Sequence, residues 1–190
     1  SIERFSDPLD ALPLMLVVAR VLEEELADID KALAINSKIL ELDQSSEPAI
    51  LALERLYLGR ERYDELLDIY RRKLELTNDP DERTEILYKL GGLYEDEVKD
   101  DDKAVETFQA ILESDGEDRR ALPSLDSNLT RNERWSEVVD NLSRQLLIVS
   151  PDEAPSECSA LKLRLAQLRE SELNDPEGAI RAYQEILDLQ

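Results

Sequence analysis

The chain repeats itself at one fixed interval, and this internal repeat constrains the fold more than any other feature. Asp30-Lys31-Ala32 returns as Asp102-Lys103-Ala104, and Glu61-Arg62-Tyr63 returns as Glu133-Arg134-Trp135 at the same offset. The register runs without a gap from residues 27–77 to 99–149, with 16 of 51 positions identical. A third copy follows, in which Asp175 corresponds to Asp100. Such a period is typical of a stacked array, in which each unit buries its apolar face against its neighbours.

Apolar residues recur at steps of three and four along almost the whole chain, which predicts one-sided helices. The first such stripe is expected to be a core face and contains Leu14, Val17, Val18, Val21 and Leu22. Ten helices with short turns predict five antiparallel hairpins, at about 8–44, 45–79, 80–116, 117–152 and 153–190, in one array over 1–190. Asp28, Asp100 and Asp175 precede second helices and are expected to cap their free backbone N–H groups.

Charge and cysteine content narrow the class of partner. The chain has 45 acidic and 23 basic residues, a formal net charge of −22. This charge repels nucleic acid and anionic membranes and favours a basic or neutral protein, although it also fits acidic helix faces that serve only solubility. Cys158 is the single cysteine, so no disulfide forms within the chain and we expect a cytoplasmic location. No long apolar run predicts a membrane span.

The sequence offers little catalytic chemistry. It contains no histidine, so the commonest general base and metal ligand is missing, and Cys158 is best interpreted as structural. Asp100-Asp101-Asp102 lacks the spaced oxygen ligands of a calcium loop and is better explained by helix capping. Gly91-Gly92 lies inside a helical pattern and indicates close helix packing. We therefore predict no catalytic residue, no cofactor and no metal site.

The hairpins resemble tetratricopeptide repeats, whose signature spaces Leu-Gly-x-x-Tyr in a first helix and Ala-x-x-x-Phe in a second. The third hairpin carries the pattern as Leu90, Gly91, Tyr94, Ala104 and Phe108. Glu54 and Asp126 depart from it, because the family prefers small residues at their position. The resemblance implies an all-α fold, a right-handed α–α superhelix of about five tetratricopeptide-like hairpins.

In this family the first helices of successive hairpins line a concave groove that binds peptides or protein segments. The resemblance places ten residues of this chain in such a groove: Leu16, Arg20, Leu51, Arg55, Tyr88, Lys89, Arg120, Ser127, Leu163 and Arg164. The Lys and Asn pairs by which one class of these repeats clamps a carboxylate are absent. The resemblance thus implies a non-enzymatic protein-interaction scaffold. A structural spacer with no ligand, or a regulatory region of a larger protein, remains an alternative.

The ends of the chain predict a further property. The sequence begins with Ser1-Ile2 and stops directly after a helical pattern, which we interpret as a piece of a longer protein. The last helix carries Ile180, Tyr183, Ile186, Leu187 and Leu189, and a terminal repeat usually needs a polar cap. We therefore expect weak end-to-end self-association through residues near Tyr183 and Leu187.

Overall fold

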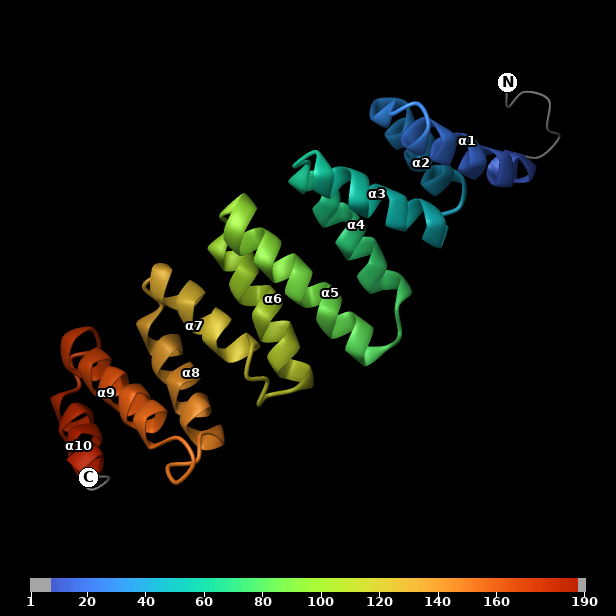
Figure 1. The fold of residues 1–190 in the computed structure, drawn as a ribbon. Helices are drawn as coiled ribbons and strands as arrows, with labels where there is room; N and C mark the ends of the chain where they lie inside the picture. Colours follow the sequence, from blue (N-terminus) through green and yellow to red (C-terminus); the bar gives the residue numbers. More distant parts are fainter. Residues whose placement is uncertain (1–7, 188–190) are drawn as a thin grey trace. The chain divides into compact units, whose positions relative to one another are not determined.

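A computed structural model describes residues 8–187 of the chain, and within these residues it contains ten α-helices and no strand (Figure 1). The helices fall into two compact units, residues 1–86 and 87–190, and the boundary lies inside helix α5 (Pro80–Leu93). The expectation of an all-helical fold is therefore confirmed. Each of the five predicted hairpin intervals holds two helices, while their continuity as one array stays a prediction.

The first unit contains a short 3-10 turn at Pro8–Ala11 and four complete helices, α1 (Leu12–Glu24), α2 (Ile29–Leu42), α3 (Glu47–Gly59) and α4 (Tyr63–Leu76). Helices α1 and α2 form one hairpin, α3 and α4 form the next, and α2 packs on α3 between them. The fully buried side chains include Ala32, Ile39, Leu53 and Leu66. Apolar burial between successive helices thus holds this unit together.

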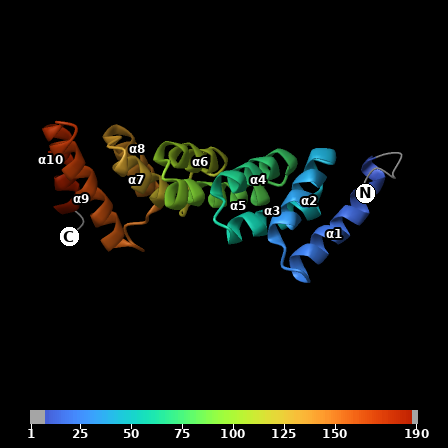
Figure 2. The same ribbon diagram turned by 90° about the horizontal axis from the view of Figure 1, so that it is seen from above.

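The second unit continues from α5 through a π-helical turn at Tyr94–Val98 into α6 (Asp101–Ser114), α7 (Ala121–Arg131) and α8 (Trp135–Ile148). It ends with α9 (Pro155–Ser171) and α10 (Pro176–Leu187), which lie side by side in both ribbon views (Figures 1 and 2). Helix α6 packs on α7 and α8 packs on α9. Within this unit, the second helix of each hairpin therefore contacts the first helix of the next hairpin.

Every hairpin turns through one residue in the left-handed backbone region. These residues are Ala27, Glu61, Lys99, Glu133 and Asn174, with φ between 51° and 60°. The residue after each of them donates its N–H back to the first helix, as in the bond of 2.8 Å from Asp28 to the Leu22 carbonyl. This arrangement ends a helix in the manner of a Schellman motif, although none of the five positions carries the usual glycine.

The predicted aspartate caps are present. Asp28 and Asp100 each accept a hydrogen bond from the backbone N–H three residues later, at 3.2 Å from Lys31 and 3.1 Å from Lys103. Asp175 accepts the N–H of Gly178 at 2.9 Å. In the second and fourth hairpins, Arg62 and Arg134 precede the second helix at the N-cap position, and neither forms a side-chain cap. The capping explanation of Asp100-Asp101-Asp102 is confirmed for its first member.

The prediction that the stripe of Leu14, Val17, Val18 and Val21 is a core face is wrong. These four side chains are exposed, and α1 instead buries Met15 and Ala19. Val18 is 40% exposed, whereas Leu90, its counterpart in the second copy of the repeat, is 6% exposed. Periodicity alone identified an apolar face, but the packing of α1 on α2 uses the small residue Ala19 and the neighbouring Met15.

Candidate functional site

Four of the ten predicted groove residues meet in one pocket of the first unit. Leu16 and Arg20 on α1 and Leu51 and Arg55 on α3 line this hollow, which has a volume of about 370 Å³. We call it the α1–α3 pocket. It forms because α1 and α3 are the first helices of consecutive hairpins, and the helix between them, α2, contributes Asn36. The remaining lining residues are Val17, Ala19, Glu23, Glu24, Pro48 and Ala52.

Both arginines of this pocket already have carboxylate partners. Arg55 donates to Glu23 through Nε at 2.9 Å and through Nη2 at 2.6 and 2.8 Å to the two carboxylate oxygens. Arg20 donates to Glu24 on its own helix at 3.1 Å. The pair of Arg55 and Glu23 also ties α3 to α1. The arginines therefore form a neutralised polar rim and present no isolated positive charge.

The apolar wall of the α1–α3 pocket is accessible to solvent. Val17 is 50% exposed and Leu51 is 48% exposed, and both side chains line the hollow. Pro48 and Ala52 extend the same wall along α3. Apolar surface inside a concave site gains free energy when a ligand covers it. The arrangement can accept an apolar side chain between two ion pairs.

Tyr88 and Arg120, which the resemblance also places in the groove, stack on one another in the second unit. The guanidinium carbon of Arg120 lies 3.8 Å from the centre of the Tyr88 ring, a cation–π contact. The Tyr88 hydroxyl donates to Asp118, and burial together with this hydrogen bond raises the pKa of Tyr88. Burial opposes ionisation of Asp118, but Tyr88 and the N–H groups of Ala121 and Arg120 lower its pKa below the usual value.

Arg164 connects α9 to α7 and does not stand free in a groove. It forms an ion pair with Asp126 and donates to the Thr130 hydroxyl at 2.8 Å. Burial raises the pKa of Asp126, and Arg164 opposes the shift. Glu54, at the equivalent position of the first unit, pairs with Lys73 at 2.8 Å. These acidic residues occupy a position where tetratricopeptide repeats favour small residues, and each holds two helices together through a charge pair.

The other three predicted groove residues are exposed and lie on three different helices. Lys89 is exposed on α5, Ser127 is exposed on α7, and Leu163 is 44% exposed on α9.

The sequence analysis did not predict Val17, Pro48 and Glu23 as residues of the α1–α3 pocket. Val17 could have been predicted as a pocket residue, because it lies close to Leu16 and Arg20 on the same helix. The ion pair of Glu23 with Arg55, on the next hairpin, was not visible in the sequence.

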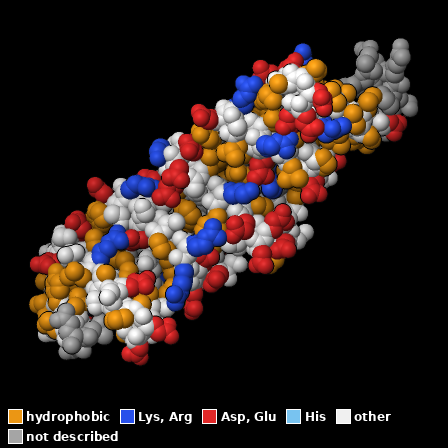
Figure 3. All heavy atoms as spheres, in the orientation of Figure 1, with side chains coloured by type: hydrophobic (Ala, Val, Ile, Leu, Met, Phe, Trp, Pro, Cys, Tyr) orange, Lys and Arg blue, Asp and Glu red, His pale blue; other side chains and the backbone are white. Residues whose placement is uncertain are grey.

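Two further properties bear on the class of site. Within residues 8–187 no three His, Cys, Asp or Glu side chains converge in a way that would hold a metal ion. No helix in this part of the chain combines the length and the apolar character needed to cross a bilayer. Figure 3 shows acidic and basic side chains interspersed over the face that it draws.

Two family models of the tetratricopeptide repeat match the sequence, one over residues 49–84 and the other over residues 85–117. No curated protein matches it. Similar solved structures include YrrB, described as a tetratricopeptide-repeat protein with an unusual peptide-binding site. YrrB is 19% identical, the match covers 93% of this chain and 84% of that one, and the TM-score is 0.50.

Two crystal structures of MamA are also similar, both with a TM-score of 0.51. One is 13% identical and the match covers 95% of this chain and 92% of that one. The other is 15% identical, with coverage of 86% and 89%. At these identities the likeness concerns the fold.

Proposed function

Because this chain belongs to the tetratricopeptide-like helical-repeat proteins, we propose that it is a non-enzymatic scaffold that binds a peptide or protein segment in the α1–α3 pocket. The observation that carries the proposal is the pair of accessible apolar side chains, Val17 and Leu51, on one pocket wall. The peptide-binding site for which YrrB is described supports the function class.

The chemistry of the pocket specifies what the segment should look like. Its wall takes an apolar side chain, because Val17, Leu51 and Pro48 line one hollow of about 370 Å³. Its rim is two ion pairs, Arg55 with Glu23 and Arg20 with Glu24, so charged groups of a partner meet both signs. The pocket is preformed by packed helices, and little ordering entropy is lost on the receptor side.

The proposed scaffold has no catalytic role. The chain has no histidine, and Cys158 is buried. A cytoplasmic location remains a prediction from the single cysteine. The second candidate function is a structural spacer, which is favoured by the internal partners of Arg55, Arg120 and Arg164. If the pocket binds nothing, these contacts serve only to fix one helix on another.

The test is selection of peptides from a random display library on the immobilised chain, followed by affinity measurements on variants. Val17→Asp and Leu51→Asp change exposed pocket residues and should leave folding intact. Leu147→Asp is the matched control, because Leu147 is 87% exposed on α8 and does not line the pocket.

We expect selected peptides with an apolar anchor whose affinity falls about tenfold or more in both pocket variants, the scale of about 1.4 kcal/mol for one lost contact. The control should bind as the wild type does. Peptides that bind all variants equally would disprove the assignment to this pocket. A library with no enriched peptide would favour the spacer.

A further inference from the structure

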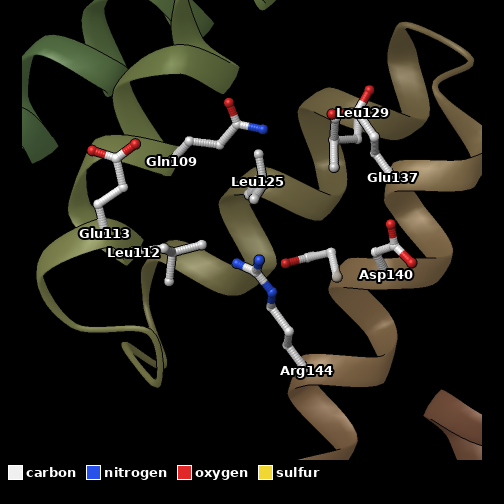
Figure 4. A pocket seen from close by; sticks show the side chains of 9 residues that line it. Gln109, Leu112, Glu113, Leu125, Leu129, Glu137, Asp140 and Arg144 are labelled. Atoms are coloured by element: carbon white, nitrogen blue, oxygen red, sulfur yellow. The ribbon is translucent and has the colours of Figure 1, made fainter.

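A second pocket lies between α6, α7 and α8, within the second unit (Figure 4). It has a volume of about 380 Å³, and we call it the α6–α8 pocket. Its floor consists of the buried residues Leu112, Leu125 and Leu129. Gln109 and Glu113 stand on the α6 side, while Glu137, Asp140 and Arg144 stand on α8. None of these residues takes part in the α1–α3 pocket.

The rim of the α6–α8 pocket carries unneutralised acid. Its three carboxylates, Glu113, Glu137 and Asp140, and the guanidinium of Arg144 give a formal charge of −2. Glu137 is held by Arg134, three residues earlier, through bonds of 2.7 and 2.8 Å. Glu113 and Asp140 form no ion pair with any residue from 8 to 187. The pocket therefore offers two carboxylates to an incoming cation.

Asn141 adds a buried acceptor that has no donor. Its side chain is 3% exposed and lines the pocket, and its Nδ2 donates to the Leu122 carbonyl at 2.9 Å. No group in the described part of the chain donates to its Oδ1. An unsatisfied buried oxygen of this kind destabilises a fold, so its presence needs an explanation. A ligand that brings an N–H group into the pocket supplies the missing donor.

An equivalent pocket occurs at the same place of the repeat in the first unit. Comparing the two pockets distinguishes residues that serve helix packing in both from residues that are available to a ligand only in the second. This α2–α4 pocket has a volume of about 490 Å³, and six positions are identical in the two pockets: Leu40/Leu112, Glu41/Glu113, Leu53/Leu125, Glu65/Glu137, Asp68/Asp140 and Arg72/Arg144. In the first unit, however, Lys38 neutralises Glu41 at 2.6 Å, and Arg71 neutralises Asp68 at 2.7 Å.

The buried amide is also missing from the α2–α4 pocket, because Ile69 occupies the position of Asn141. Lys38 and Arg71 correspond to Ala110 and Ser143 in the second unit, where neither residue can neutralise a carboxylate. In the first pocket, Glu41, Glu65 and Asp68 thus form ion pairs within the chain, and no buried amide is present. The second keeps two free carboxylates and one free amide oxygen.

We propose that the α6–α8 pocket binds a lysine or arginine side chain from a basic segment of a partner protein. The aliphatic stem lies against the leucine floor, and the carboxylates of Glu113 and Asp140 attract the cationic head from opposite sides of the pocket (Figure 4). An N–H of the same head supplies the donor that the Asn141 oxygen lacks. The net charge of −22 attracts such a partner and accelerates its approach. Arg144 lies at the same pocket, and its positive charge lowers the affinity of the pocket for a cation.

The test uses two-dimensional ¹H–¹⁵N NMR of the full chain at about 150 mM salt, where long-range attraction between exposed charges is screened. The probe is a short blocked glycine peptide with one central arginine, and matched peptides carry lysine or the neutral isostere citrulline. The pocket variant is Glu113→Gln with Asp140→Asn. The control is Glu117→Gln with Asp152→Asn, which removes the same charge from exposed positions outside the pocket.

We expect the arginine or lysine peptide to shift the signals of Leu112, Asn141 and Arg144 and to leave the α2–α4 pocket largely unchanged. The pocket variant should weaken binding about tenfold, as for the loss of charge-assisted hydrogen bonds, whereas the control should not. Asn141→Ile should weaken it as well, and Arg144→Gln should strengthen it. Equal shifts with citrulline, equal weakening in the control, or shifts spread over all acidic surfaces would overturn the proposal. None of these outcomes bears on peptide selection at the α1–α3 pocket.

Discussion

Two adjacent glycines in α5 provide a sharp test of how closely the helices of the second unit pack. A Cβ atom added at Gly91 would lie 2.8 and 2.9 Å from Cζ and Cε1 of the Phe108 ring on α6. Carbon atoms attract best at about 3.5–4.0 Å, so the added methyl group would overlap the ring. Phe108 is buried and has little room to move. A Cβ at Gly92 would meet no atom within 4 Å.

The two Gly→Ala substitutions share one effect and differ in another. Neither glycine has a positive φ, so alanine fits both backbones and gains about 0.5–1 kcal/mol from helix preference. Gly91→Ala also overpacks the core, at a cost of about 1–3 kcal/mol. Because the helix term cancels in the comparison, Gly91→Ala should be less stable than Gly92→Ala by about 1–3 kcal/mol.

Urea unfolding followed by circular dichroism at the helix band measures this difference through the free energies of unfolding. Phe108→Leu should relieve the overlap, so the double variant with Gly91→Ala should lose less stability than the two single losses together. Equal stability of Gly91→Ala and Gly92→Ala would refute the close approach of α5 to Phe108. So would additive losses in the double variant.

Three further expectations follow. Leu112→Ala should lower the free energy of unfolding by about 2–5 kcal/mol, because Leu112 is buried, and urea unfolding with almost no loss would contradict its place in the core. Asp100→Ala should remove a helix cap worth about 0.5–2 kcal/mol at pH 7. Its hydrogen bond with Lys103 lowers the pKa of Asp100, so the wild-type advantage in thermal unfolding should be full above about pH 4 and shrink as the pH falls further. Leu187 is 70% exposed on α10, so sedimentation should show weak self-association that grows with salt and disappears in Leu187→Glu, and a strict monomer at every salt concentration would contradict it.

Helix content and helix starts could be predicted because both depend on local chemistry. Asp28, Asp100 and Asp175 each precede the second helix of a hairpin, and each accepts a capping hydrogen bond from the residue three positions later. The packing role of Gly91 followed from its place inside a helical pattern, and the neighbouring ring of Phe108 explains it. Gly92 does not share that role, since the space beside it is open.

The helix ends were harder to predict, because the hairpins turn through left-handed residues that are not glycine. Lys99 and Asn174 occupy equivalent positions, with φ of 60° and 51°, and only asparagine is a common residue for such a turn. The cost of a left-handed residue is offset by the hydrogen bonds that close the helix, such as Asp100 N–H to the Tyr94 carbonyl at 3.0 Å. This balance is a property of the hairpin and is not visible in residue preferences.

The candidate site was predicted only in part. The resemblance indicates which helix face lines a groove, but it does not indicate which side chains on other helices pair with the residues of that face. Four groove residues do meet in the α1–α3 pocket, but Arg55 pairs with Glu23 on another helix. Arg164 similarly pairs with Asp126, which lies two helices earlier in the chain. Such pairs depend on how one hairpin stacks on another, which one-dimensional spacing does not fix. Ser1, Ile2 and Leu189, which also entered the predictions from the sequence, lie outside the described residues.

The internal repeat offers a way to separate structural from functional identity. Most charged residues that are identical in the two copies have a structural role. Asp28/Asp100 cap helices, Lys31/Lys103 pair with those caps, and Arg62/Arg134 pair with Glu65/Glu137. Asp43 and Asp115 each accept a backbone N–H in a turn, both at 3.0 Å. These identities are explained by the fold alone.

Three identical charged positions of the α6–α8 pocket have no such role. Glu113, Asp140 and Arg144 form no ion pair among residues 8–187, although Glu41 and Asp68, the counterparts of the two acids, do so in the first unit. The second unit carries these acids without the bases that pair with them in the first unit, and because Glu113 and Asp140 are exposed they are available to a partner. The buried Oδ1 of Asn141 lines the same pocket and carries the cost of an unsatisfied acceptor. Available carboxylates and an unsatisfied acceptor in one pocket both favour a cationic hydrogen-bond donor as its ligand.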